Sequence, residues 1–470
     1  MAERVKSTFD AGITSERQIL RQHLRENTDI DTHVRQIPLP PMPNPVPERI
    51  LGTFRDPGAR KSITADMEII QGYASEGRVL PSFLEAGPRE SLVFQPQSVR
   101  AAIVTTGGLA PGLNCVVHSL VTRHCSTYSV NDNMRGGIFG VYDGFMGLCR
   151  RPLEMKVLRP EITEPWLEMG GSALGCRRFY DKTPEQLAAD IVTNLRLNDI
   201  NILYIIGGDG SMKVAHEIAT IGDDVSVVGI PKTMDNDLLW VWQSFGFNTA
   251  VEQATAAVNT MHWEAESTRR VCLLELFGAE SGFVAANAAL ASGHVDLVLI
   301  PEPFTELTPK QCETALADYV DYLARCVRDK DRPHALVVLA EGVAQVLSEY
   351  GVKLGKESVS KTDFVGQLKR HLQGRLTDRT GNDIDVYVNQ PRHNIRAVRA
   401  NAHDQIYTER LGALAADNAL AGYTDFMISQ WLTEYVLVPL PLVIGRHKSI
   451  PPSGIFWKQV MASTGQPFGT

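Results

Sequence analysis

Short apolar runs recur between residues 99 and 340, and each ends at a turn rich in glycine, proline or polar residues. The runs cover residues 99–104, 136–141, 201–206, 225–230, 271–277, 295–300 and 335–340, and helical spacing follows most of them. Continuous apolar runs of about 4–8 residues between turns are typical of buried strands. Strands that alternate with helices favour parallel sheets covered on both faces. The pattern therefore predicts an α/β protein with mostly parallel sheets.

Two of these turns hold groups that suit a phosphate. Residues 205–211 read IIGGDGS, and residues 229–237 read GIPKTMDND. Glycines let a ligand approach the backbone, and free N–H groups at a helix start favour an anion. A carboxylate such as Asp209 can hold a hard cation that bridges phosphates. An ordinary strand-to-helix turn or a solvated acidic turn explains each stretch alone, but their recurrence at strand ends, where parallel sheets bind ligands, predicts a phosphate site.

Two further glycine-rich stretches follow the same logic. Residues 107–114 read GGLAPGLN after a strand, and residues 170–179 read GGSALGCRRF and end in an arginine pair. Arginine near a phosphate loop can neutralise charge, although a surface pair is the alternative. The sequence contains no GxGxxG, GxxxxGK[ST], GxSxG or HExxH motif. We expect His393 and His447 to be surface or hydrogen-bonded residues and not metal ligands.

The composition is that of an ordinary globular protein. The 470 residues are 44% hydrophobic and 21% charged, with a net charge of −8. This acidic balance argues against nucleic-acid and anionic-membrane partners. The seven cysteines are scattered without a CxxC pair, and no stretch reaches the length of a membrane span. We expect reduced thiols and a cytoplasmic location.

Residues 1–99 differ from the rest of the chain. One polar helix is expected near residues 15–25, and six prolines lie within residues 38–47. Proline removes backbone donors, so this segment should be extended. We expect an arm that lies over a surface of its own or of a neighbouring subunit, with a partly disordered tail as the alternative.

Taken together, these motifs resemble phosphofructokinase from about residue 99 to 442, most closely the long-chain subfamily of plants and trypanosomatids. Further stretches that carry the resemblance are FGFNTAVEQA (245–254), SGFVAANAALAS (281–292), LIPEPF (299–304), AEGV (340–343) and IRAVRANAHD (395–404). The resemblance implies two Rossmann-like three-layer domains with the active site in the cleft between them. It divides the chain into an arm (1–99), a nucleotide domain (100–238, with 408–447 returning to it), a sugar-phosphate domain (239–407) and a tail (448–470). Members are usually homotetramers or homodimers.

The implied activity is transfer of the γ-phosphoryl group of ATP to the 1-hydroxyl of fructose 6-phosphate, with Mg²⁺, as in glycolysis. Asp235 would be the base, Asp237 would add negative charge, Thr233 would hold the transferring group, and Asp209 would bind the metal. The implied catalytic set is Lys232, Thr233, Asp235 and Asp237. The nucleotide set is Gly107, Gly108, Arg178, Phe179, Gly207, Gly208, Asp209, Gly210 and Ser211. The substrate set is Thr233, Met234, Asp235, Arg270, Phe277, Gly278, Ala279, Glu341, His393 and Arg396, and Arg270 matches an arginine that bacterial relatives donate across a subunit interface.

The residue after GGD bears on the phosphoryl donor. Pyrophosphate-using members resemble one another in carrying Asp at that position, which crowds the inner phosphate of a nucleotide. This chain has Gly210 there, which favours ATP, with pyrophosphate as the alternative.

The chain departs from the family pattern around the acceptor. Ala279 stands where an arginine is expected, His393 where a tyrosine is expected, and Tyr387 where a lysine is expected. Three interpretations stay open. The enzyme compensates with Arg269, Arg270 or Arg392, it phosphorylates a different acceptor, or it is a non-catalytic regulatory relative.

Overall fold

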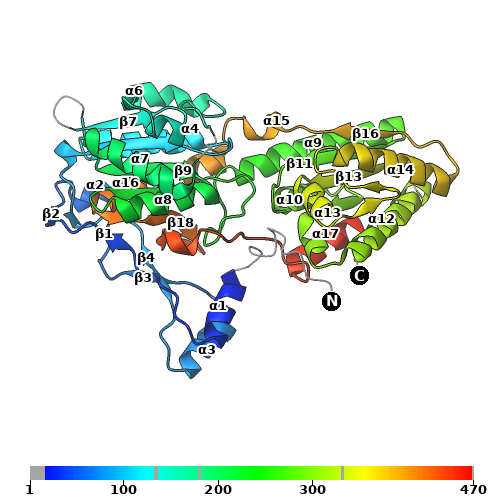
Figure 1. The fold of residues 1–470 in the computed structure, drawn as a ribbon, viewed down its shortest axis with the longest axis horizontal. Coiled ribbons are helices and arrows are strands. Elements are labelled where there is room, and N and C mark those ends of the chain that lie inside the picture. The colour runs from blue at the N-terminus through cyan, green and yellow to red at the C-terminus, as the bar shows by residue number, and fades with distance from the viewer. Residues whose placement is uncertain (1–15, 132–135, 178–181, 330–332, 468–470) are drawn as a thin grey trace.

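The computed structural model describes residues 16–131, 136–177, 182–329 and 333–467. Two α/β domains lie side by side, and the long helix α9 (Phe247–Thr268) runs between them (Figure 1). A smaller part that contains α1 (Glu16–Arg25) and α3 (Met67–Ser75) projects below the first domain. Within these residues, no helix is both long and apolar enough to span a bilayer.

The first domain is built on one large sheet. In the described part of the chain its nine strands follow the order β3-β4-β19-β18-β10-β9-β6-β7-β8. The five neighbouring strands from β18 to β7 run parallel, and the remaining strands pair antiparallel at the two edges. The bounds are β3 (Arg60–Ser62), β4 (Ser82–Glu85), β6 (Arg100–Thr105), β7 (Gly137–Val141), β8 (Met155–Leu158), β9 (Ile202–Gly207), β10 (Ser226–Pro231), β18 (Phe426–Trp431) and β19 (Glu434–Pro439).

The second domain has an all-parallel sheet. Its four described strands follow the order β12 (Leu297–Leu299), β13 (Ala335–Ala340), β11 (Val271–Leu276) and β16 (Val386–Asn389). The mostly parallel α/β class predicted from the apolar runs is confirmed in both domains.

Side-chain alternation along the buried strands creates a core on each face of each sheet. On β9, Tyr204 belongs to one core and Ile205 to the other. On β11, Leu273 and Leu274 divide in the same way. Helices cover both faces, so each domain has three layers. The covering helices are α4 (Leu113–Thr122), α7 (Pro184–Leu197), α8 (Asp209–Ile221) and α16 (Ala402–Leu420) in the first domain, and α9, α10 (Phe283–Ser292), α12 (Pro309–Asp329), α13 (Gly342–Glu349) and α14 (Phe364–Thr380) in the second.

The N-terminal region is partly built into the first domain. Strand β4 pairs with β19 and β3 with β4, so this region covers an edge that would otherwise be unpaired. The proline-rich segment is extended, and its strand β2 (Met42–Pro43) pairs with β5 (Ser91–Leu92). The region expected to form an arm over a surface therefore also extends the sheet.

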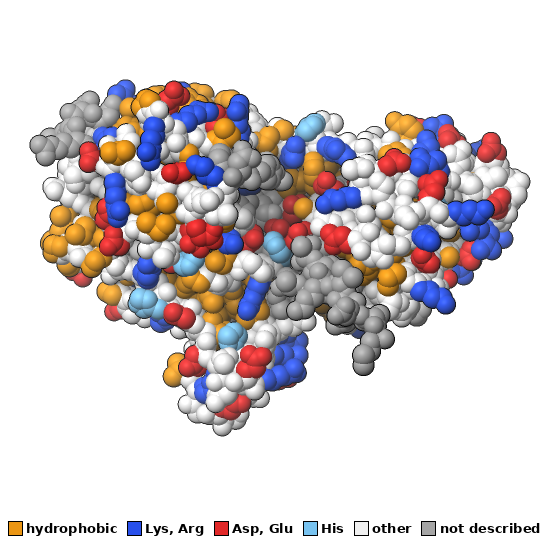
Figure 2. All heavy atoms as spheres, viewed as in Figure 1, with side chains coloured by type: hydrophobic (Ala, Val, Ile, Leu, Met, Phe, Trp, Pro, Cys, Tyr) orange, Lys and Arg blue, Asp and Glu red, His pale blue; other side chains and the backbone are white. Residues whose placement is uncertain are grey.

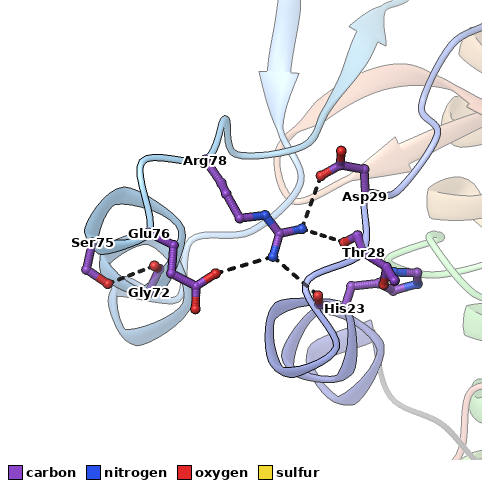
Figure 3. Close-up of polar contacts among 7 residues, drawn as sticks. All are labelled: His23, Thr28, Asp29, Gly72, Ser75, Glu76 and Arg78. Carbon is purple, nitrogen blue, oxygen red and sulfur yellow. Dashed lines mark hydrogen bonds and ion pairs between the residues drawn. The ribbon is translucent and has the colours of Figure 1, made fainter.

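Arg78 holds the projecting part together (Figure 3). Its guanidinium donates to the carbonyls of His23 (3.3 Å) and Thr28 (2.5 Å) at the end of α1, and pairs with Asp29 and Glu76. One planar cation thus joins the loop after α1 to the loop after α3, which fixes the angle between the two helices.

The C-terminal part of the chain visits both domains. Strands β18 and β19 belong to the first sheet, and the chain then passes through η4 (Leu440–Leu442) and crosses to α17 (Ile455–Thr464) in the second domain (Figure 1). There α17 packs against α10 and β12. Residues 443–454 therefore connect the two domains a third time, after the crossing at α9 and the return between β16 and α16.

Candidate active site

The turn between β9 and α8 is shaped by small residues. A Cβ on Gly207 would lie 2.3 Å from Oγ1 of Thr106 and 2.4 Å from Oγ of Ser211, so only glycine fits. Thr106 Oγ1 donates to Ser211 Oγ at 2.7 Å, which ties the end of β6 to the start of α8. The first N–H groups of this 13-residue helix lie at the carboxyl edge of the sheet, where they favour an anion.

Asp209 opens α8 and is held from a distant part of the chain. Its Oδ1 accepts a hydrogen bond from the N–H of Gly445 at 3.0 Å. Burial raises the pKa of Asp209, and the nearby carboxylate of Asp237 raises it further, while His447 lowers it. Two carboxylates close enough to perturb each other favour a bound cation.

These carboxylates fit a magnesium ion that shares its ligands with phosphates. Among the described residues, no group of three or more His, Cys, Asp and Glu side chains is placed to hold a metal ion alone. Mg²⁺ in phosphotransfer sites is usually bound by one or two carboxylates together with substrate phosphates. Asp209 and Asp237 are a donor set of that kind.

Gly210 borders open space. A Cβ built on it would meet no atom within 4 Å. Glycine is therefore not required there by the packing of the protein, and the volume beside it is available to a ligand.

The turn after β10 lies against the turn after β9. The N–H of Lys232 donates to the carbonyl of Gly207 at 2.9 Å. Gly107 has φ +76°, and a Cβ on it would lie 3.3 Å from Nζ of Lys232. The Lys232 side chain is buried, with 6% of the residue exposed. The structure thus brings together three predicted turns, including Gly108 next to Gly107, around one buried ammonium group.

Thr233, Asp235 and Asp237 form a compact turn at the domain junction. Thr233 Oγ1 donates to Oδ1 of Asp237 at 2.8 Å and accepts from the N–H of Asp235 at 3.1 Å. Ser281, in the second domain, donates through Oγ to the carbonyl of Asp235 at 2.8 Å. Met234 is buried beneath the turn. The space-filling view shows acidic side chains and a histidine gathered at this junction (Figure 2).

Two turns of the second domain face the junction and are bonded to each other. The N–H of Glu341 donates to Leu276 O at 3.0 Å, and the N–H of Gly342 donates to Gly278 O at 3.1 Å. Gly278 has φ +143°, and a Cβ there would lie 2.3 Å from the Ser281 carbonyl. The loops after β11 and β13 therefore form one rigid surface that includes Phe277 and Ala279.

The segment after β16 brings cations to this surface. Short helix α15 (His393–Arg396) places the Arg396 guanidinium 5.1 Å from the centre of the Phe277 ring, and its Nη2 lies 3.5 Å from Nδ1 of His393. Phe277, His393 and Arg396 thus lie close together, and their part in a substrate surface stays a prediction.

Glu275 belongs to this surface and was not predicted from the sequence. It accepts from Nε2 of Gln390 at 2.5 Å and lies 3.5 Å from Nη2 of Arg392. Burial raises the pKa of Glu275, and Glu341 raises it further. The sequence did offer a signal for Glu275, since it is the single acidic residue within the apolar run 271–277. Arg392, one of the three arginines expected to compensate for Ala279, is therefore at the acceptor side.

The structure does not bring Arg270 to this site. Arg270 precedes β11, whereas Phe277 follows it, and a strand rises about 3.3 Å per residue, so roughly 20 Å separate them. Arg270 instead lies 3.6 Å from Glu264 and 3.8 Å from Asp385. Arg270 therefore does not contact the candidate site of its own chain, and its expected role across a subunit interface stays a prediction.

Tyr387 also lies away from the site, since it pairs with Cys272 near the amino end of β11 and is 46% exposed. Arg178 and Phe179 are outside the described residues. Their neighbour Arg177 lies 3.3 Å from a carboxylate oxygen of Asp143.

The fold and the site define a two-domain α/β protein with a candidate site at the carboxyl ends of its strands, where proteins with parallel sheets bind ligands. A family model described as Phosphofructokinase matches residues 100–419, and the chain belongs to this family. The resemblance read from the sequence is confirmed.

Several relatives are similar over most of the chain. An "ATP-dependent 6-phosphofructokinase" of Borreliella burgdorferi is 36% identical and covers 82% of this chain and 85% of its own length. The chloroplastic "ATP-dependent 6-phosphofructokinase 5" of Arabidopsis thaliana is 35% identical over 81% of this chain and 68% of its own.

Solved structures share the fold. The pyrophosphate-dependent phosphofructokinase of Nitrosospira multiformis matches with a TM-score of 0.62 at 16% identity, over 79% of this chain and 93% of its own. The T-state phosphofructokinase of Pichia pastoris matches with a TM-score of 0.59 at 21% identity, over 78% of this chain and 37% of its own.

Proposed function

We propose that this chain transfers the γ-phosphoryl group of ATP to the 1-hydroxyl of fructose 6-phosphate and so forms fructose 1,6-bisphosphate in glycolysis. The observation that carries the proposal is the contact between two domains at one turn. The Thr233–Asp237 hydrogen bond orders a turn next to the Gly207 loop, while Ser281 of the second domain holds the Asp235 carbonyl. Donor and acceptor surfaces therefore meet at Asp235.

Each side chain has a chemical task in this proposal. Asp235 takes the proton of the sugar hydroxyl, and Thr233 holds the transferring group. Lys232 and the N–H groups of Gly107, Gly108 and residues 207–211 neutralise donor phosphates. Asp209, with Asp237, would hold Mg²⁺, whose charge offsets that of the phosphates when it is bound. Phosphoryl transfer depends mainly on such positioning and charge neutralisation.

The acceptor is assigned to the second domain. Arg396 and Glu341 would bind the sugar phosphate next to Phe277 and Gly278. The proposal assigns the nucleotide to residues 100–238 with the returning segment, and the acceptor to residues 239–407. Arg270, at the far end of β11, could serve only a neighbouring subunit, which supports a homo-oligomer. A cytoplasmic location is part of the same proposal.

ATP is favoured over pyrophosphate by two observations. The relatives of Borreliella burgdorferi and Arabidopsis thaliana described above carry names that begin with ATP-dependent 6-phosphofructokinase. The open space beside Gly210 leaves room for the inner phosphate of a nucleotide.

A second candidate is a kinase of the same fold with a different acceptor. Ala279 supports it, because a methyl group supplies no charge on a surface that faces the transferring phosphate. Arg392 supports the first candidate, because its guanidinium already lies on the same surface next to Glu275.

The test is a matrix of turnover measurements with Mg²⁺. ATP and pyrophosphate are crossed against fructose 6-phosphate and a panel of other sugar phosphates. ATP-dependent turnover of fructose 6-phosphate supports the first candidate, and turnover of another acceptor alone supports the second. Binding of ATP without turnover of any acceptor would refute both.

A further inference from the structure

Residues 445–450 cross from the first domain to the second and pass directly over the candidate site. We call this segment the strap. In Figure 1 it is part of the red connection between η4 and α17. It lies beyond residue 419, where the family match ends. A role for the strap in phosphoryl transfer rests on the proposed function, because it concerns the same reaction.

The strap bonds to both turns of the first domain that carry carboxylates. The Gly445 N–H donates to Asp209 Oδ1 at 3.0 Å. The Lys448 N–H donates to the Asp237 carbonyl at 2.7 Å, and His447 forms an antiparallel bridge with Leu238. The distance between the two turns is therefore set in part by the strap.

The Lys448 side chain is half-buried, and its ammonium group uses all three of its hydrogens within one turn. It donates to Asn236 Oδ1 at 3.0 Å, to Val241 O at 2.8 Å and to Trp242 O at 3.2 Å. Burial lowers the pKa of Lys448 to about 8, so the group stays charged at neutral pH. Removing an ammonium group from water is costly unless it is hydrogen-bonded, and here every hydrogen-bond acceptor belongs to residues 236–242.

Asn236 is the residue between the two catalytic carboxylates, and its backbone is unusual. Its φ is +55°, in the left-handed region that L-residues adopt at some cost. Its Oδ1 accepts from Lys448 Nζ and also from the Ser244 N–H at 3.1 Å. These two bonds fix the residue that determines how Asp235 and Asp237 are presented.

The other end of the strap is bonded to the second domain. His447 Nε2 lies 3.3 Å from Oε2 of Glu280, and its Nδ1 lies 3.8 Å from Oδ2 of Asp237. The Ile450 N–H donates to Glu302 Oε1 at 3.1 Å.

The same Glu302 oxygen accepts from the Gly282 N–H at 2.9 Å, and the neighbouring Ser281 holds the Asp235 carbonyl. Hydrogen bonds and short pieces of chain thus form a closed circuit. It runs from Asp235 through Ser281, Glu302 and Lys448 back to Asn236.

We propose that the strap is a working part of the phosphoryl-transfer site and that Lys448 is a positioning residue for Asp235. Lys448 acts through Asn236 and is not itself in contact with the reacting atoms. A misplacement of about 1 Å in a reacting group can cost roughly 100-fold in rate. The loss of three hydrogen bonds to this turn should therefore lower the rate of phosphoryl transfer.

The test compares Lys448→Met with Lys458→Met. The first variant keeps the length of the side chain and removes the charge. The control replaces an exposed lysine of the neighbouring helix α17. We expect Lys448→Met to lower kcat by at least about 10-fold while KM for ATP changes less than about twofold, and Lys458→Met to change neither.

Hydrogen exchange of residues 232–245 should accelerate in Lys448→Met alone. Lys448→Gln, which keeps a donor, should lie between wild type and Lys448→Met, and it replaces Lys448→Met if that variant does not fold.

A double variant separates positioning from general destabilisation. Added to Asp235→Ala, Lys448→Met should cause no further loss of turnover, since Lys448 acts through Asp235. Unchanged exchange of residues 232–245, unchanged kcat, or full additivity with Asp235→Ala would overturn the proposal. If wild type does not phosphorylate fructose 6-phosphate, the proposed function fails, and the exchange measurement still decides whether Lys448 holds the turn.

Discussion

Glu302 predicts a stability that depends on pH in a defined direction. The residue is 1% exposed, and one carboxylate oxygen accepts the N–H groups of Gly282 and Ile450. The other oxygen is buried without a hydrogen-bond partner among the described residues. Burial raises the pKa of Glu302 from 4.5 to about 7, and the backbone hydrogen bonds oppose this only in part. The folded protein therefore prefers the neutral carboxyl group.

The magnitude follows from linkage between protonation and folding. Because the folded pKa lies above the unfolded one, the contribution of Glu302 is fully present below about pH 4.5 and is lost as pH rises through 7. The difference between a pKa of 4.5 and one of about 7 corresponds to a free energy of about 3 kcal/mol. Glu302→Gln keeps an acceptor for both N–H groups and removes the titration.

The measurement is the thermal midpoint of unfolding at pH 5 and pH 8 for wild type, Glu302→Gln and Glu306→Gln. Glu302 lies in the short helix α11 (Pro301–Thr305), and the exposed Glu306 directly follows this helix. Glu306→Gln therefore controls for the loss of one negative charge. For a chain of 470 residues that unfolds as one unit, we expect the midpoint of Glu302→Gln to rise relative to wild type by roughly 3 °C between the two pH values. A difference between Glu302→Gln and wild type that does not change with pH would refute the reasoning.

Two further predictions concern the donor side. Gly210→Asp should lower kcat/KM for ATP by at least about 10-fold without changing the fold, because the new side chain enters open space next to Asp209. The control is Gly374→Asp, at an exposed helical glycine with no atom near its Cβ. Equal ATP kinetics in the two variants would contradict the prediction. Asp235→Ala should reduce turnover by about 100-fold or more while ATP affinity, measured by calorimetry, stays within about twofold; retained turnover would remove Asp235 from its assignment as the base.

The sequence predicted the elements of the site well because each depends on local chemistry. The apolar run 201–206 predicts a buried strand, and the residue after it, Gly207, is packed so closely that a side chain would not fit. Parallel strands end at the same edge of a sheet, so the turns after β9 and β10 had to be neighbours. The Lys232–Gly207 hydrogen bond is the direct consequence.

The sequence itself indicates at which end of its strand Arg270 lies. A residue that precedes a strand lies at its amino end, whereas Phe277 and Ala279, which follow the strand, lie at its carboxyl end. Strand direction therefore separates Arg270 from Phe277 and Ala279 within one chain, and its service to a neighbouring subunit stays a prediction.

The strap could not have been found in this way. Residues 445–450 read GRHKSI, with no apolar period and no known motif. Their role comes from the path of the chain, which leaves the first sheet after β19 and must cross the junction to reach α17. Contacts over more than 200 residues, such as that of Lys448 with Asn236, leave no local pattern in a single sequence.

Ala279 and His393, two of the unusual residues of this chain, lie on the second-domain side of the site, and this bears on the acceptor. On the donor side, the structure shows four hydrogen-bonded residues, Asp209, Thr233, Asp235 and Asp237. On the surface of the second domain, Ala279 supplies no positive charge. Arg392 has a φ of +24° and lies 3.5 Å from the buried carboxylate of Glu275. A phosphorylated acceptor would compete with Glu275 for this guanidinium, since both are anions. The acceptor that fits best is therefore one whose phosphate can replace the Glu275 contact, and the balance between these two anions determines whether Arg392 substitutes for the missing arginine.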